Sequence, residues 1–262
     1  MAVTWHKHES CGFVVLNNPP VNAINHNMRE GLINAAKWAE REELERVILS
    51  GEGRGFAAGA DTKEFDHPPV SPHLPDVINH IEASTIPWIA AIHGAALGGG
   101  GELALGCRYR IARADATIGF PEVILGLVPG AGATQRLPRL IGLTEALKLI
   151  PTGKTISGKA AMAIGLVDAI DDDPITAAKL IDQKILSEVV PLNLTKAGAD
   201  RTVNYEAARQ IAIRRMRGQE APLTAISLLE MAQTATFDDG MQKERTAFLA
   251  LRASSKARAL RD

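Results

Sequence analysis

The sequence has few cysteines and few aromatic residues. Only two of its 262 residues are cysteine, Cys11 and Cys107, and aromatic residues make up 4%. Two cysteines supply neither a disulfide framework nor a cysteine-rich metal site, and they favour a reducing compartment, so we expect a cytoplasmic protein. The seven histidines show no metal-ligand spacing, and no bound metal is expected.

Strong net charge and long hydrophobic runs are also missing. With 29 Lys and Arg against 30 Asp and Glu, the net charge is −1, which gives no electrostatic argument for a nucleic-acid partner. No stretch of about 20 residues is free of both charge and glycine, so we expect no membrane span. No signal peptide is visible at the start. At 46% hydrophobic residues, the composition is typical of a globular protein with a large core.

Strand and helix signals alternate over most of the chain and then give way to helices alone. Short apolar runs predict strands at 13–16, 47–50 and 88–92, and helical spacing predicts a helix over 28–41. Strand signals nearly vanish after Pro174, where we expect helices at 175–188, 204–217, 221–235 and 240–258. We therefore divide the chain into an α/β core, 1–190, and a C-terminal helical region, 191–262.

Four consecutive glycines, residues 98–101, stand between a predicted strand and a good helix start. This order places free backbone N–H groups at a helix N-terminus, where they bind anions or an oxygen that becomes negative in a transition state. The alternative is a tight turn where the helix packs closely on the sheet. The run matches neither a phosphate loop nor a dinucleotide-binding fingerprint.

Two glutamates accompany the glycines. Glu102 follows them directly and should lie in the first helical turn, where the helix dipole favours an acid. Glu122 lies in the apolar block GFPEVILG, and burial in such surroundings suits a carboxyl group to proton transfer near neutral pH. Each glutamate alone is more simply structural. Together with the glycines, they predict acid/base chemistry beside an oxyanion site.

Four sequence blocks, in this order and spacing, resemble the enoyl-CoA hydratase/isomerase (crotonase) superfamily. They are FAAGADTK at 56–63, HGAALGGGGELAL at 93–105, GFPEVILG at 119–126 and LVPGAGATQRL at 127–137. The resemblance implies a crotonase-type spiral of ββα turns with a C-terminal helical region that builds an oligomer, a homotrimer or a dimer of trimers. We expect the helix opened by Gln135 and Arg136 at the subunit interface.

The resemblance also implies roles for individual residues. The backbone N–H groups of Ala60 and Gly99 should form an oxyanion hole for a thioester carbonyl. Glu102 matches the glutamate that activates water, and Glu122 matches the one that delivers a proton to the α-carbon.

Residues next to Ala60 match positions that lie near coenzyme A in relatives. Small side chains at Ala58 and Ala60 would let the CoA moiety lie against the backbone, and Asp61 belongs to the same block. Lys63 is a candidate partner of a CoA phosphate, with a solvated surface lysine as the alternative. No cofactor is expected, because CoA is part of the substrate.

The presence of both glutamates favours hydration of a 2-trans-enoyl-CoA to a 3-hydroxyacyl-CoA, with fatty-acid β-oxidation as the default pathway. The alternatives are a Δ3,Δ2-enoyl-CoA isomerase and a non-catalytic acyl-CoA-binding subunit. The blocks ELALGCRYRIA, 102–112, and PEVILGLVPG, 121–130, resemble the hydratase domain of bifunctional fatty-acid oxidation enzymes. The dehydrogenase domain that follows there has no counterpart here, so no NAD chemistry is expected and a separate 3-hydroxyacyl-CoA dehydrogenase is a candidate partner.

Overall fold

The computed structural model describes residues 1–198, 200 and 202–261. The chain forms two compact units. Unit 1 comprises Met1–Ile118 and Ile156–Pro191, and unit 2 comprises Gly119–Thr155 and Leu192–Asp262. The boundary predicted after residue 190 lies beside the end of unit 1, while residues 119–155 group with the C-terminal helices. Glu122 thus belongs to unit 2, whereas the other predicted site residues belong to unit 1.

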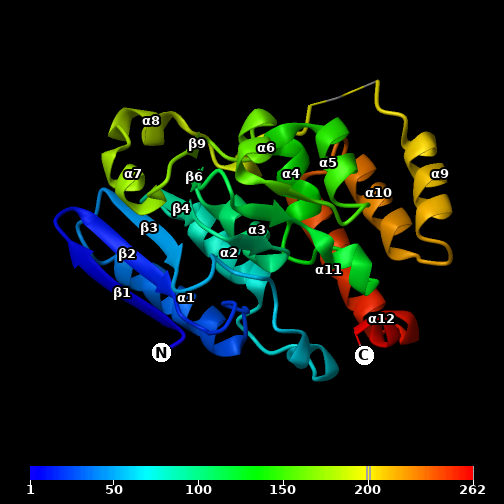
Figure 1. The fold of residues 1–262 in the computed structure, drawn as a ribbon, viewed down its shortest axis with the longest axis horizontal. Helices are drawn as coiled ribbons and strands as arrows, with labels where there is room; N and C mark the ends of the chain where they lie inside the picture. The colour runs from blue at the N-terminus through cyan, green and yellow to red at the C-terminus, as the bar shows by residue number, and fades with distance from the viewer. Residues whose placement is uncertain (199, 201, 262) are drawn as a thin grey trace. The chain divides into compact units, whose positions relative to one another are not determined.

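Unit 1 is built on a six-stranded sheet with the order β1-β2-β3-β4-β6-β9 (Figure 1). Only the β1–β2 pair is antiparallel. The central strands are buried on both faces, so they appear in the sequence as unbroken apolar runs. The strands are β1 Val3–His8, β2 Cys11–Leu16, β3 Arg46–Gly51, β4 Trp88–Ile92, β6 Tyr109–Ala112 and β9 Ala169–Ile170.

A short three-stranded sheet has the order β5-β7-β8. Its strands are β5 Ala95–Leu97, β7 Thr117–Gly119 and β8 Thr155–Ser157. The chain passes into unit 2 at the end of β7 and returns to unit 1 within β8.

Helices of unit 1 cover the large sheet and carry the loops of the candidate site. Helix α7 packs on β3, β4 and β6, and its Ala178 joins Ile48, Ile89 and Ile111 in one buried cluster. Burial of each of these isoleucines contributes about 1.5–3 kcal/mol. The helices are α1 His26–Ala39, η1 Thr62–Asp66, α2 Leu74–Ala83, α3 Gly99–Gly106, α6 Gly158–Ala163, α7 Pro174–Leu180 and α8 Gln183–Glu188.

A buried arginine ties β3 to the end of α7. Arg46 is 5% exposed. Its Nη1 donates to the carbonyl oxygens of Ala178, Lys179 and Ile181 at 2.7–3.1 Å. These carbonyls are the ones a helix leaves without an intrahelical partner at its C-terminus. Arg46 therefore satisfies them from the neighbouring strand.

Unit 2 consists of helices around one buried polar cluster. Gln135 and Arg136 are fully buried inside the unit, where the Arg136 guanidinium lies over the ring of Phe237 at 5.0 Å. These two side chains therefore pack within their own chain, and the expectation that the helix they open lies at a subunit interface stays a prediction. The helices are η2 Pro121–Leu125, α4 Ala133–Ile141, α5 Leu143–Leu149, η3 Leu192–Leu194, α9 Tyr205–Arg215, α10 Ala221–Met231, α11 Phe237–Ala253 and α12 Ser255–Arg261.

The predicted mixture of α/β core and C-terminal helices is confirmed. Among the described residues, no helix combines the length and the apolar character that crossing a bilayer requires.

Candidate active site

The backbone of residues 57–61 is fixed from both sides. On one side, Ala57 exchanges backbone hydrogen bonds of 2.9 Å with β5, donating to Ala95 and accepting from Leu97. On the other side, the Ile24 N–H donates to the Gly59 carbonyl at 2.8 Å. Gly59 has a φ of +100°, a conformation that favours glycine. The segment that carries Ala60 is therefore held in one position by its neighbours.

The amide groups predicted for the oxyanion hole lie next to each other. An ideal Cβ placed on Gly99 would be 3.4 Å from the Ala60 nitrogen, so the two backbones are in contact at this point. Among the described residues of unit 1, neither N–H group donates to a backbone carbonyl. Both are therefore available to a carbonyl oxygen that enters between them, which is the arrangement an oxyanion hole needs.

The glycine run serves the fold as well as the site. Gly98 has a φ of +52°, and a Cβ on Gly100 would collide with the carbonyl oxygen of Ala57. These two glycines are explained by the turn and by the close packing of α3, as the structural alternative predicted. Gly99 is the member of the run that faces the Ala60 amide.

Glu102 and Glu122 lie in the first turns of two different helices. Glu102 is only 3% exposed, and its N–H donates to the Gly98 carbonyl at 2.9 Å in the first turn of α3. A carboxylate in this position interacts favourably with the positive end of the helix. Glu122 lies in the first turn of η2 in unit 2 and is half-buried. Its carbonyl accepts the Leu127 N–H at 3.0 Å, which closes the turn that carries it.

A third glutamate, Glu244 of α11, anchors the chain that follows Glu122. It is fully buried, and its two carboxylate oxygens accept the N–H groups of Gly132 at 2.6 Å and Thr134 at 2.8 Å. These donors belong to the N-terminus of α4. A carboxylate there accepts hydrogen bonds from otherwise unpaired N–H groups and interacts favourably with the positive end of the helix dipole. Sequence reasoning missed this residue, because its partners are more than 100 positions away.

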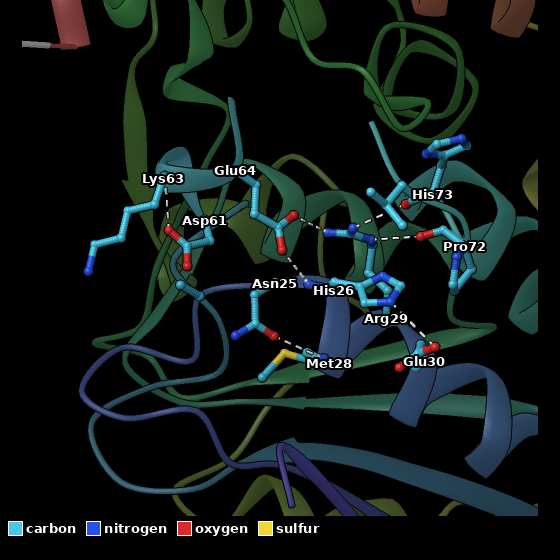
Figure 2. A network of polar contacts seen from close by, with 12 residues as sticks. Asn25, His26, Met28, Arg29, Glu30, Asp61, Lys63, Glu64, Pro72 and His73 are labelled. Atoms are coloured by element: carbon cyan, nitrogen blue, oxygen red, sulfur yellow. Dashed lines mark hydrogen bonds and ion pairs between the residues drawn. The ribbon is translucent and has the colours of Figure 1, made fainter. Parts of the chain in front are cut away.

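The residues predicted to contact CoA lie just before the short helix η1 and in its first turn. Ala58 is half-buried and Lys63 is exposed. The Asp61 carboxylate accepts the Lys63 N–H at 3.0 Å and so serves as the N-cap of η1 (Figure 2). Asp61 thus fixes the backbone from which the Lys63 side chain extends into solvent.

An ion pair beside this helix was also missed. The Arg29 Nη1 of α1 lies 2.6 Å from the Glu64 Oε2 of η1, next to Lys63 in the chain (Figure 2). Arg29 is only 8% exposed, although it is a charged residue in the first turn of α1. No short motif joins two residues 35 positions apart, so only the fold brings them together.

Comparison with known proteins gives one family. The model of the enoyl-CoA hydratase/isomerase family matches residues 6–221 of this chain. The chain belongs to this family. The peroxisomal bifunctional enzyme of Danio rerio is 37% identical over 258 residues, which cover 96% of this chain and 36% of the relative. A probable enoyl-CoA hydratase of Bacillus subtilis is 45% identical over 162 residues, which cover 59% of this chain and 63% of the relative.

Solved structures of the family agree with the fold. The crystal structure of the enoyl-CoA hydratase from Thermoplasma volcanium superimposes with a TM-score of 0.65 at 32% identity, covering 93% of this chain and 97% of the other. The prediction of a crotonase-type α/β fold is thereby confirmed. The chain spans about a third of the length of the bifunctional relatives that it matches.

Proposed function

We propose that this protein is an enoyl-CoA hydratase that adds water to a 2-trans-enoyl-CoA and releases a 3-hydroxyacyl-CoA. The observation that carries the proposal is the contact between the Gly99 and Ala60 backbones, with Glu102 three residues further along α3. Two free amides with an adjacent buried carboxylate suit a thioester that gains enolate character while water attacks it. Family membership supports the same reaction.

The reaction balances over two proton transfers. Glu102 takes a proton from water, and the hydroxide oxygen forms a bond with the β-carbon. The electron pair of the double bond moves to the thioester, whose carbonyl oxygen is held by the N–H groups of Ala60 and Gly99. Glu122 then gives its proton to the α-carbon, and solvent resets both carboxyl groups. A positioned acid or base typically contributes about 10²–10⁴-fold in rate.

Substitution of each glutamate tests the proposal. Glu102→Gln and Glu122→Gln should each lower the kcat for hydration of a 2-enoyl-CoA by about 10²–10⁴-fold. The exposed Glu188, at the end of α8, provides a matched control, and Glu188→Gln should leave kcat unchanged. Loss of the conjugated enoyl absorbance measures the rate. Undiminished hydration in both glutamine variants would end the assignment.

The same variants separate the alternatives. A Δ3,Δ2-enoyl-CoA isomerase needs only one proton shuttle, so Glu102→Gln would retain most of the activity and Glu122→Gln would lose it. A non-catalytic subunit would bind a saturated acyl-CoA in a calorimeter and turn over no enoyl-CoA. Both outcomes contradict the hydratase proposal.

The proposal extends to the surroundings of the enzyme. Relatives named as fatty acid oxidation complex subunits support β-oxidation as the pathway. Relatives named as bifunctional enzymes support a second activity beside this one, and we propose a separate 3-hydroxyacyl-CoA dehydrogenase as the partner that supplies it. We propose no cofactor beyond the CoA of the substrate. Both cysteines are free thiols, which supports a reducing compartment such as the cytoplasm.

A further inference from the structure

The carboxylate of Glu64 joins η1 to the first turn of α1 through both of its oxygens. Its Oε2 lies 2.6 Å from the Arg29 Nη1, and its Oε1 accepts the His26 N–H at 2.6 Å (Figure 2). Hydrogen bonds to a carboxylate are stronger than those between neutral groups, and the Arg29–Glu64 ion pair is partly shielded from solvent.

Arg29 uses its other donors on the proline-rich segment that follows η1. Its Nε donates to the Pro72 carbonyl at 2.7 Å, and its Nη2 donates to the Val70 carbonyl at 3.3 Å. The rigid, planar guanidinium presents these donors in fixed directions. A single side chain therefore ties three segments together: the first turn of α1, helix η1 and residues 70–72.

The oxyanion segment does not depend on this pair. Backbone hydrogen bonds of Gly59 and Asp61 with Ile24 fix the chain on either side of Ala60. Lys63, by contrast, stands on η1 directly beside Glu64, so its position follows that of the helix. Loss of the pair should loosen Lys63 and leave the Ala60 amide in place.

We propose that Arg29 and Glu64 are positioning residues for recognition of the nucleotide end of coenzyme A. The pair holds η1 so that the Lys63 ammonium meets a CoA phosphate. This inference rests on the proposed function and assigns these two residues to substrate binding, not to the chemical step.

The test measures kcat and KM of Arg29→Met in the full chain. With a 2-enoyl-CoA, KM should rise about tenfold while kcat stays within about twofold. With the same acyl group on N-acetylcysteamine, which lacks the nucleotide, kcat/KM should be unchanged. Glu64→Gln, which keeps the shape of the side chain, should shift KM in the same direction and serves if Arg29→Met does not fold.

Two further variants distinguish positioning from general stabilisation. Lys63→Ala should raise KM alone, and the double variant Arg29→Met/Lys63→Ala should be no worse than the poorer single variant, because both act through one contact. Arg46→Met is the matched control: it removes a buried arginine of the same unit that, like Arg29, donates hydrogen bonds to backbone carbonyls, and its KM should match the wild type.

Any one of three results would overturn the positioning role of Arg29 and Glu64. The first is a KM of Arg29→Met no higher than that of Arg46→Met, and the second is an equal fall in kcat/KM on the truncated thioester. The third is additive effects of Arg29→Met and Lys63→Ala on KM. A wild-type protein that hydrates no enoyl-CoA would instead refute the proposed function. An active wild type with an unmoved KM in Arg29→Met and Glu64→Gln would refute the positioning role alone.

Discussion

At the scale of the residue, three buried or half-buried glutamates differ in their surroundings, and the tasks that we propose for them differ accordingly. Glu102 lies in the first turn of the fully buried helix α3, and Glu122 lies in the first turn of η2. Glu244 is the most buried of the three, yet its oxygens are occupied by the N-terminus of α4. The first two could be predicted because each lies in a block with a recognisable pattern. Glu244 could not, because an isolated acid in an amphipathic helix resembles a solvated one.

Cys107 allows a prediction of pH dependence. Burial raises the pKa of its thiol to about 12, with a smaller contribution from Glu82, while Arg110 acts in the opposite direction. Because the thiolate is the reactive form, raising the pH from 7 to 10 should leave its alkylation by iodoacetamide negligible in the folded protein. The half-buried Cys11 should be labelled over the same range.

Peptide mass spectrometry measures both modifications, and unfolding in urea should expose Cys107 to the reagent. The raised pKa also makes the stability of the protein depend on pH. The unfolded chain loses this thiol proton near pH 9.0, whereas the folded chain retains it to a pH of about 12. The free energy of unfolding should therefore fall across this window, and less so in Cys107→Ala. Equal labelling of the two cysteines at pH 8 would contradict the burial of Cys107.

At the scale of the element, strong local patterns gave the best predictions. The strand predicted at 88–92 is β4, Trp88–Ile92, and the helix predicted at 28–41 is α1, His26–Ala39, where Asn25 supplies the N-cap. β1, Val3–His8, was not predicted, because three of its six residues are His or Lys. Its place is set by antiparallel pairing with β2, which is a tertiary contact.

Helix ends depended on partners that the local sequence does not show. The predicted helix 175–188 is two helices, α7 and α8, separated at Ile181 and Asp182. Helix α7 ends there because Arg46 donates hydrogen bonds to its last carbonyls. The Asp182 side chain then caps the N-terminus of α8. The predicted helix 240–258 is likewise two helices, because the chain becomes extended at Ser254.

The glycine run supports a prediction for α3. Gly100→Ala should destabilise the protein by about 1–3 kcal/mol or more, because the added methyl group meets the backbone carbonyl of Ala57 and neither side can yield. The hydration activity of Gly100→Ala should also fall, because a displaced Ala57 would shift the Ala60 amide, which lies three residues further along the chain. Urea unfolding measures the change.

Gly198→Ala is the control for this substitution. Among the described residues, no atom lies within 4 Å of an ideal Cβ on Gly198, so that variant should unfold like the wild type. A Gly100→Ala protein as stable as Gly198→Ala would show that α3 does not pack on Ala57 as closely as described.

At the scale of the whole molecule, the resemblance to the family predicts an assembly. We expect light scattering to give three or six times the 28.0-kDa mass of the chain. A monomeric mass at micromolar concentration would contradict the predicted oligomer. It would also show that the C-terminal helices pack within their own chain alone.

The candidate site was more predictable than the contacts that support it. Ala60, Gly99, Glu102 and Glu122 all lie in the sequence blocks typical of the family, because the chemistry needs those residue types at those spacings. Arg29 and Glu64 are 35 residues apart and meet only when the fold is formed. Local patterns carry information about helix and strand periodicity, whereas long-range ion pairs depend on the tertiary structure.

The most direct test of the central claim is the reaction of the wild-type protein with a 2-trans-enoyl-CoA in D₂O. The account predicts a 3-hydroxyacyl-CoA with one deuterium on the α-carbon, and loss of that product in Glu102→Gln and Glu122→Gln. Recovery of unchanged substrate, or of a 3-enoyl-CoA with no hydroxyl group added, would contradict it.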